Sequence, residues 1–190
     1  MAVNHLAHCF LSFGEPETLV GNFVADYVKG SRWRDYPPGV QTGILLHRQI
    51  DAFADGHEAA ARSRKRIREG AGRYAGPVTD ILYDHLLCRH WETYAGDWAF
   101  EEFAAHTYDT LAQASLPAPL DAVAPRMIAG RFLHGYRHRD GLAWVLERFA
   151  HRISGAMDPD ASMAIFEQAL PDFDADFHAF FPDMLRDIGR

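Results

Sequence analysis

Apolar residues recur along the chain mostly at three- and four-residue spacing, and strict alternation of apolar and polar residues is scarce. This pattern predicts α-helices throughout. The expected helices cover about 3–13, 17–29, 38–53, 57–69, 77–94, 99–114, 121–135, 140–153, 160–170 and 173–187. We expect connecting loops at the Gly-rich stretch 70–76 and the Pro-rich stretch 115–125. Because no repeat or long linker divides the chain, the sequence predicts an all-α fold with a single domain over residues 1–190.

Helix start signals agree with these segments. Pro38 and Pro77 each lie near the expected first turn of a helix. Proline is well tolerated at this position. Asp158 and Pro159 have the form of an N-cap followed by a first-turn proline. These signals predict where individual helices begin.

Composition limits the class of protein. The chain has 190 residues, of which 48% are hydrophobic and 24% are charged, as in ordinary soluble globular proteins. No run approaches the roughly 18 apolar residues of a membrane span, and the N-terminus does not have the form of a signal peptide. Cys9 and Cys88 form no CxxC motif, so neither a disulfide framework nor a zinc knuckle is expected. A cytoplasmic location is the simplest expectation.

The charge is uneven. A net charge of −7 argues against a general nucleic-acid binder. The stretch 62–68 nevertheless contains five basic side chains and no acid: Arg62, Arg64, Lys65, Arg66 and Arg68. Such a patch can steer an acidic partner, or it can be a solvated helix face. Both interpretations stay open from the sequence.

Four stretches each place two metal-competent side chains four residues apart inside an apolar run. Residues at this spacing share one helix face, and carboxylates or imidazoles are costly to bury unless they are paired or bind a metal. The pairs are Asn4 and His8, Asn22 and Asp26, His47 and Asp51, and Asp80 and Asp84, the last followed by His85. Their coincidence predicts a metal-dependent hydrolase.

Each pair also has a structural explanation. His47 and Asp51 can form a hydrogen-bonded pair without metal. Asp80 is more easily explained as an acid near a helix N-terminus, and Asn4 as a satisfied core group. His90, Asp55 and His57 are lesser candidates. The histidines expected at the surface without a role include His106, His134, His138 and His178.

Longer strings contain these pairs. They are Asn4-His-Leu-Ala-His8, Gly21-Asn-Phe-Val-Ala-Asp-Tyr-Val-Lys-Gly30, Tyr36-Pro-Pro, His47-Arg-Gln-Ile-Asp51-Ala-Phe and Tyr83-Asp-His-Leu-Leu, with Phe132-Leu-His-Gly-Tyr-Arg and Phe177-His-Ala-Phe-Phe-Pro-Asp-Met farther on. Together the strings resemble the acyl-carrier-protein phosphodiesterase family. The resemblance covers nearly the whole chain and is densest before residue 92.

The resemblance implies a helical relative of the HD phosphohydrolases. It implies hydrolysis of the phosphodiester that joins 4′-phosphopantetheine to a serine of holo-acyl carrier protein. HD enzymes present His, a His-Asp doublet and then Asp along the chain. Here the doublet is Asp84-His85 and Asp26 precedes His47, so the fold is expected to be HD-domain-like with an altered order of motifs.

The resemblance also implies site residues. The expected metal ligands are Asp26, His47, Asp51 and Asp84, although Asp51 could instead orient His47. The expected catalytic residues are Asp84, His85, His8 and Asn22, with His85 or His8 as the proton donor. The expected cofactor is a divalent metal, Mn²⁺ first, with Fe²⁺, Mg²⁺ or Zn²⁺ as the other possibilities. The acidic carrier protein is expected to bind Arg62, Arg64, Lys65, Arg66 and Arg68, together with Lys29 and Arg32.

Two other functions remain open from the sequence. One is an HD-type nucleotide or cyclic-nucleotide phosphohydrolase, which would use the same metal without a protein partner. The other is a non-catalytic helical binding protein, in which the polar pairs are buried structural hydrogen bonds. Metal analysis of the purified protein separates this last possibility from both enzymes.

Overall fold

The computed structural model describes residues 5–189, and this range is helical, with no strand. The α-helices are α1 His5–Phe10, α2 Pro16–Val24, α3 Pro38–Gly56, α4 Glu58–Ala71, α5 Ala75–Arg89, α6 Trp91–Tyr94, α7 Phe100–Gln113, α8 Leu120–Ala129, α9 Arg139–Arg152, α10 Pro159–Gln168 and α11 Leu170–Asp187. Short 3-10 helices are η1 Ala25–Tyr27, η2 Arg32–Asp35, η3 Gly72–Tyr74 and η4 Phe132–Tyr136. The prediction of a single all-α domain is confirmed.

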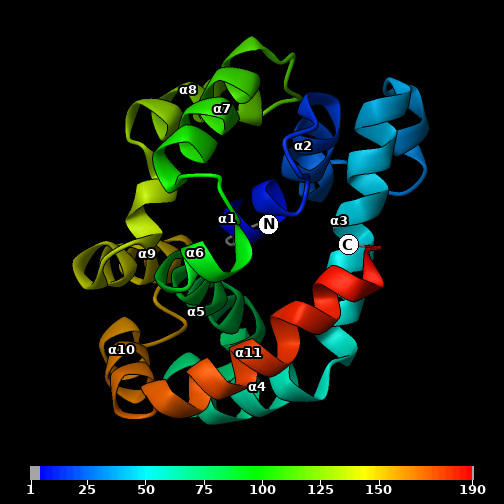
Figure 1. Cartoon of the computed structure of the whole chain (residues 1–190). Helices are drawn as coiled ribbons and strands as arrows, with labels where there is room; N and C mark the ends of the chain where they lie inside the picture. The colour runs from blue at the N-terminus through cyan, green and yellow to red at the C-terminus, as the bar shows by residue number, and fades with distance from the viewer. Residues whose placement is uncertain (1–4, 190) are drawn as a thin grey trace.

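Helices α1 and α5 lie at the centre of the molecule, and the other helices surround them (Figure 1). Helix α5 buries residues on every side, including the consecutive residues Ile81, Leu82, Tyr83 and Asp84, as expected of a helix without a continuous polar face. Helices α4, α10 and α11 pack together at one end, and α7 and α8 lie at the other. The buried apolar residues form one cluster.

Helices α2 and α3 approach each other closely because both carry a glycine at the contact. A Cβ atom on Gly21 would lie 2.1 Å from the Val40 carbonyl oxygen, and one on Gly43 would lie 2.1 Å from the Thr18 carbonyl oxygen. No side chain fits at these distances, so glycine is required at both positions. The contact sets Asn22 of α2 directly against His47 of α3.

Helix α1 is joined to α5 by Asp84. Its two carboxylate oxygens accept hydrogen bonds from the backbone amides of Leu6 and Ala7, at 3.0 and 2.8 Å. These amides lie in the first turn of α1, where helical N–H groups have no partner within the helix. Asp84 thus caps α1, although it lies more than seventy positions farther along the chain. This contact holds in place the helix that carries His8.

Several element boundaries differ from the prediction. The stretch 70–76 is not a loop, because α4 continues to Ala71 and α5 already begins at Ala75. Helix α8 begins inside the expected Pro-rich loop and contains Pro125. The segment expected at 17–29 ends as an α-helix at Val24 and tightens into η1. The helix expected at 77–94 breaks at His90.

Other local predictions agree with the structure. The Asp158 side chain accepts a hydrogen bond from the Ala161 amide at 2.9 Å, which confirms the N-cap. No helix among the described residues has the combination of length and hydrophobicity needed to cross a bilayer. The HD-like order of motifs stays a prediction. Asn4 lies outside the described residues.

Candidate metal centre

Four polar side chains from three elements meet near the middle of the molecule. They are His8 from α1, Asp26 from η1, and His47 and Asp51 from α3. The His47 Nε2 atom lies 3.2 Å from an Asp51 oxygen and 3.4 Å from an Asp26 oxygen. The His8 Nε2 atom lies 3.4 Å from the other Asp51 oxygen. Three of the four expected metal ligands therefore come together, and His8 joins them.

Asn22 orients both imidazole rings from behind. Its amide nitrogen donates to the His8 carbonyl at 2.8 Å and to Ser12 Oγ at 3.2 Å, so its side-chain oxygen faces the histidines. That oxygen lies 2.8 Å from His8 Nδ1 and 3.1 Å from His47 Nδ1, and the Asn22 carbonyl lies 2.9 Å from His47 Nδ1. Because oxygen only accepts here, each Nδ1 carries a proton, and each Nε2 faces the carboxylates, where it offers a lone pair when the ring is neutral.

The charges at the centre are strongly coupled. Burial disfavours a charged His47, but Asp26 and Asp51 outweigh burial and raise the pKa of His47 to about 9. Burial alone would raise the pKa of Asp51, yet His47 and His8 hold it below its ordinary value. Burial lowers the pKa of His8, with Asp51 opposing this shift. The carboxylates thus favour one added positive charge between them.

The donor set fits a divalent cation. Two ligands that each lie about 2.1 Å from an ion, at tetrahedral or octahedral angles, are about 3.0–3.4 Å apart. The observed separations of 3.2 and 3.4 Å match this range. One ligand atom from each of His8, His47 and Asp51 lies within 4.8 Å of the others. His8 Nε2 is also buried without a hydrogen-bond partner among the described residues, an unmet acceptor that a cation would satisfy.

A cavity of about 230 Å³ extends from this centre. Asp26, His47 and Asp51 line its polar end, and the apolar wall includes Phe180 and Met184 of α11. Its polar lining also includes Asp55 and Asp80. The cavity lining therefore combines apolar and acidic residues with the candidate cation ligands.

Asp80 lines the cavity, although the sequence interpretation did not include it among the expected site residues. It does not lie in the first turn of α5, so the explanation as a dipole-favoured N-terminal acid is wrong. Burial raises the pKa of Asp80 to about 7, Asp51 and Asp55 add to the shift, and Arg64 opposes it. Within the described part of the chain the structure records no hydrogen bond for this carboxyl group. Its spacing from Asp84 was the only sequence signal.

Asp84 and His85 lie away from the four-residue centre. Both Asp84 oxygens are bound to the α1 amides described above, and its side chain is fully buried. Burial raises the pKa of Asp84 well above its ordinary value, although the two amides oppose the shift. His85 Nδ1 lies 2.7 Å from the Tyr136 carbonyl, and the ring packs edge-on against Phe166. Neither residue lines the cavity, so the geometry gives them positions different from those expected.

Several basic side chains of α4 form contacts within the protein. Arg62 and Arg66 each lie 2.7 Å from the buried carboxylate of Asp176 on α11. Arg64 donates to the carbonyls of Ala54 and Asp55. Of the expected partner-binding cations in α4, Lys65 and Arg68 remain exposed and form no ion pair with another described residue.

Lys29 and Arg32 do not extend this patch. They are exposed near η2, which lies beside the N-terminal half of α3, whereas α4 follows the C-terminal end of α3 (Figure 1). Helix α3 has 19 residues and is therefore about 28 Å long. The expected single basic surface is thus divided between two regions.

Two of the lesser candidates, His90 and His57, each contact a carboxylate of α11. His90 Nε2 lies 2.8 Å from an Asp174 oxygen, and His57 Nε2 lies 3.3 Å from an Asp183 oxygen. The His57 ring also accepts the Ala59 amide and caps α4, a role that the sequence interpretation did not include. Neither histidine lines the cavity, but each ring packs against a phenylalanine of the cavity wall, His57 against Phe180 and His90 against Phe177.

The chain is similar to known proteins along most of its length. A family model described as acyl carrier protein phosphodiesterase matches residues 3–184. The acyl carrier protein phosphodiesterase of Yersinia pestis is 27% identical over 186 residues, which are 97% of this chain and 96% of the relative. The protein of the same name from Escherichia coli O6:K15:H31 is 29% identical and covers 99% of this chain and 98% of the relative.

A third relative, from Salmonella paratyphi A, also has the name acyl carrier protein phosphodiesterase. It is 32% identical over 157 residues, which are 79% of each chain. No solved structure matches the chain significantly. The chain belongs to the acyl carrier protein phosphodiesterase family.

Proposed function

We propose that the protein hydrolyses the phosphodiester between 4′-phosphopantetheine and a serine of holo-acyl carrier protein, with a divalent cation held by His8, His47, Asp51 and Asp26. Family membership supports the reaction and the substrate. The observation that carries the metal dependence is the convergence of two imidazole Nε2 atoms on Asp51. Mixed imidazole and carboxylate ligands suit Mn²⁺, Fe²⁺ and Zn²⁺, and manganese, which the family resemblance implies, is the first to test.

When bound, the cation supplies a Lewis acid for a phosphoryl oxygen and lowers the pKa of a bound water. The protein residues supply orientation. Asn22 keeps both Nδ1 protons in place, so that His8 and His47 turn their lone pairs into the centre. Asp51 directs one oxygen to the Nε2 atom of each of the two stacked rings, and its side chain is about half exposed at 52%, which leaves an approach for the substrate.

We assign the proton donor to Asp80 rather than to His85 or His8. The departing serine oxygen needs a proton, and a useful donor titrates near the working pH. Asp80 faces the same cavity as the four candidate ligands, and burial raises its pKa to about 7. His8 is occupied as a ligand in this arrangement, and His85 donates to a backbone carbonyl outside the cavity.

The apolar wall of the cavity suits the pantetheine arm. Phe180 and Met184 present apolar surface next to the polar end. An arm that leaves the phosphate in this direction would cover that surface and exclude water from the reacting phosphorus. Residues of α11 therefore contribute to binding the prosthetic group in this proposal.

Incubation of the purified protein with holo-acyl carrier protein and Mn²⁺ tests the reaction. Mass spectrometry of the carrier should reveal loss of the complete phosphopantetheine group and recovery of the unmodified serine. The loss should stop in excess chelator and return when Mn²⁺ is restored. Asp51→Asn is a matched inactive control, because it keeps the side-chain shape but removes the charge between the two histidines. An intact holo-carrier after incubation with fully metal-loaded protein would refute the proposed reaction.

A further inference from the structure

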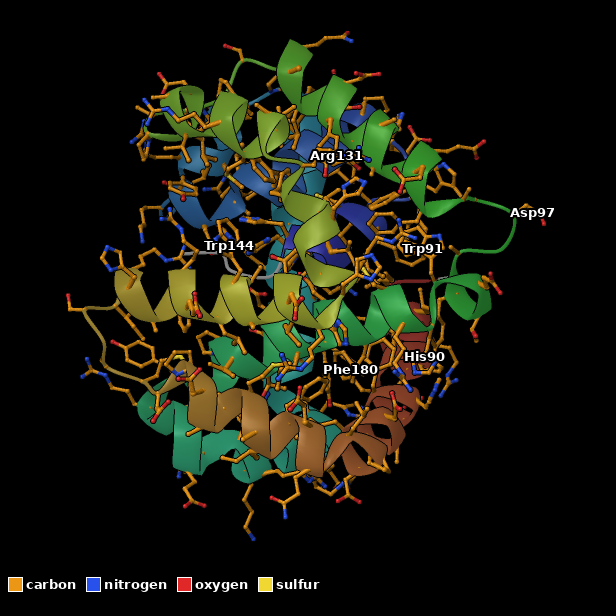
Figure 2. All side chains as sticks on the ribbon, turned by 90° about the vertical axis from the view of Figure 1, so that its left-hand side faces the viewer. His90, Trp91, Asp97, Arg131, Trp144 and Phe180 are labelled. Atoms are coloured by element: carbon orange, nitrogen blue, oxygen red, sulfur yellow. The ribbon has the colours of Figure 1, made fainter. Side chains whose placement is uncertain are left out.

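A groove between α8, η4 and α9 lies outside the cavity that holds the candidate metal ligands. Its volume is about 640 Å³, and its lining includes Val123, Arg126 and Met127 of α8, and Trp144, Arg148 and Arg152 of α9. Figure 2 views the molecule from this side, with Trp144 on the side of α9 that faces α8. None of these residues takes part in the proposed chemistry.

The groove exposes large apolar side chains. Trp144 is 57% exposed and Val123 is 43% exposed. In the described part of the chain these are two of the three large apolar residues with high exposure, the third being Leu45. An aromatic residue gathered with other apolar groups at the surface is typical of the centre of a protein interface.

Arginines surround this apolar surface. Arg126, Arg148 and Arg152 are exposed, and none forms an ion pair with another residue between 5 and 189. The described lining contains no aspartate or glutamate, although the whole chain has a net charge of −7. Trp144, Arg148 and Arg152 follow one another at four-residue spacing and therefore share one face of α9. A partner for this face needs apolar side chains flanked by carboxylates.

The groove also borders the candidate metal centre. Tyr27, which lines the groove, directly follows Asp26, and His5 lines it one turn before His8 on α1. A partner seated in the groove would hold its own surface next to the ligands.

The basic stretch of α4 offers less to such a partner. Arg62 and Arg66 are paired with Asp176. The recess that Lys65 and Arg68 line contains alanine and glycine but no large apolar side chain. It can attract charge, but it lacks the apolar centre that stabilises a specific interface.

We propose that the groove between α8 and α9 docks an acidic amphipathic helix of the acyl carrier protein. The carboxylates of that helix pair with Arg126, Arg148 and Arg152, and its apolar side chains cover Trp144 and Val123. The proposal rests on the proposed function, because that function names the carrier protein as the substrate. It adds where the carrier binds and why the modified serine arrives beside Asp26.

Two double charge reversals with equal change in net charge test the docking site. Arg126→Glu with Arg148→Glu alters the groove, and Lys65→Glu with Arg68→Glu alters the recess of α4. At low salt the groove variant should raise KM for holo-carrier at least tenfold, keep kcat within about twofold, and hydrolyse bis(4-nitrophenyl) phosphate at the wild-type rate. The α4 variant should raise KM less than threefold. A groove variant with unchanged KM, or an α4 variant with the larger increase, would overturn the proposal.

Direct binding separates this inference from the proposed reaction. Labelled apo-carrier should bind the Mn²⁺-loaded wild-type protein, and both the groove variant and Trp144→Ala should weaken binding at least tenfold. Circular dichroism and bound metal check that each variant is folded. If holo-carrier binds at the groove but is not cleaved, the reaction is refuted and the docking site stands. If holo-carrier is cleaved and apo-carrier binds the groove variants as tightly as the wild type, the docking site is refuted and the reaction stands.

Discussion

Replacing Asp84 by Asn separates a helix cap from a metal ligand. The change keeps the size of the side chain, so it leaves no cavity. It replaces one acceptor oxygen by an NH₂ group, which faces a backbone amide of Leu6 or Ala7 and cannot accept its hydrogen bond. One first-turn amide of α1 then has no partner in a site from which water is excluded.

The expected loss follows from these contacts. A buried hydrogen-bond donor that loses its partner costs about 1–3 kcal/mol, and this site is fully shielded from water. We expect the free energy of unfolding to fall by about 2–3 kcal/mol. For a chain of this length each kcal/mol lowers Tm by about 2–4 °C, so the variant should unfold about 4–12 °C below the wild type.

Thermal unfolding of the metal-free protein, followed by circular dichroism, measures this shift. Mn²⁺ titration at a temperature where the variant is folded should still give stoichiometric binding. Asp51→Asn is the matched comparison, because Asp51 belongs to the candidate ligand set and is not the carboxylate that caps α1. A variant at Asp84 that keeps the wild-type Tm and loses stoichiometric metal would refute the capping role and restore Asp84 as a ligand.

Four further outcomes are expected. Asn22→Ala removes the side-chain acceptor for both imidazoles, so Mn²⁺ affinity measured by calorimetry should fall about 10- to 100-fold. The control is Ser12→Ala, which spares the contacts between Asn22 and the imidazoles. Equal Mn²⁺ affinities in the two variants would contradict the orienting role of Asn22. Gly21→Ala forces α2 away from α3 and should lower the free energy of unfolding in urea by about 1–3 kcal/mol while weakening Mn²⁺ binding; a variant as stable as the wild type would show that the helices can separate freely. The pKa of His47 is about 9 in the metal-free protein, so below this pH a cation must displace a proton from His47. The logarithm of Mn²⁺ affinity should therefore rise by about one per pH unit until near pH 9. A flat profile would remove His47 from the candidate ligand set. Asp80 donates a proton only below its pKa of about 7. We therefore expect kcat to fall as the pH rises through this value, or through a lower one when the cation is bound, and Asp80→Asn should abolish the fall. An identical pH profile in the variant would assign the proton to another group.

Part of the centre could be predicted from spacing alone. His47 and Asp51 are four residues apart in a regular helix, so their side chains necessarily share a face. Asn22 and Asp26 stay close even though α2 ends between them, because η1 continues the turn. Local geometry therefore places His47 beside Asp51 and Asn22 near Asp26, whereas the choice of candidate ligands came from the family resemblance.

Spacing could not predict which way the remaining carboxylates face. Asp84 has the same kind of apolar neighbours as Asp26, but its partners are amides in α1. Asp176 gave no local signal, yet it binds two arginines more than one hundred positions away. A buried carboxylate can be satisfied by a cation, an arginine or backbone N–H groups. Only the packing of distant helices decides among them.

The early end of α2 has a consequence for how the centre tolerates change. The Asn22 carbonyl belongs to the last turn, where helical carbonyls lack a successor to bond, and it accepts the His47 proton at 2.9 Å. The Nδ1 proton of His47 is therefore held partly by the main chain, which no substitution at position 22 can delete, whereas among the described residues the Nδ1 proton of His8 is held by the Asn22 side chain. A substitution of Asn22 during evolution would therefore loosen His8 more than His47. Changes in cation selectivity are expected to act through His8 on α1.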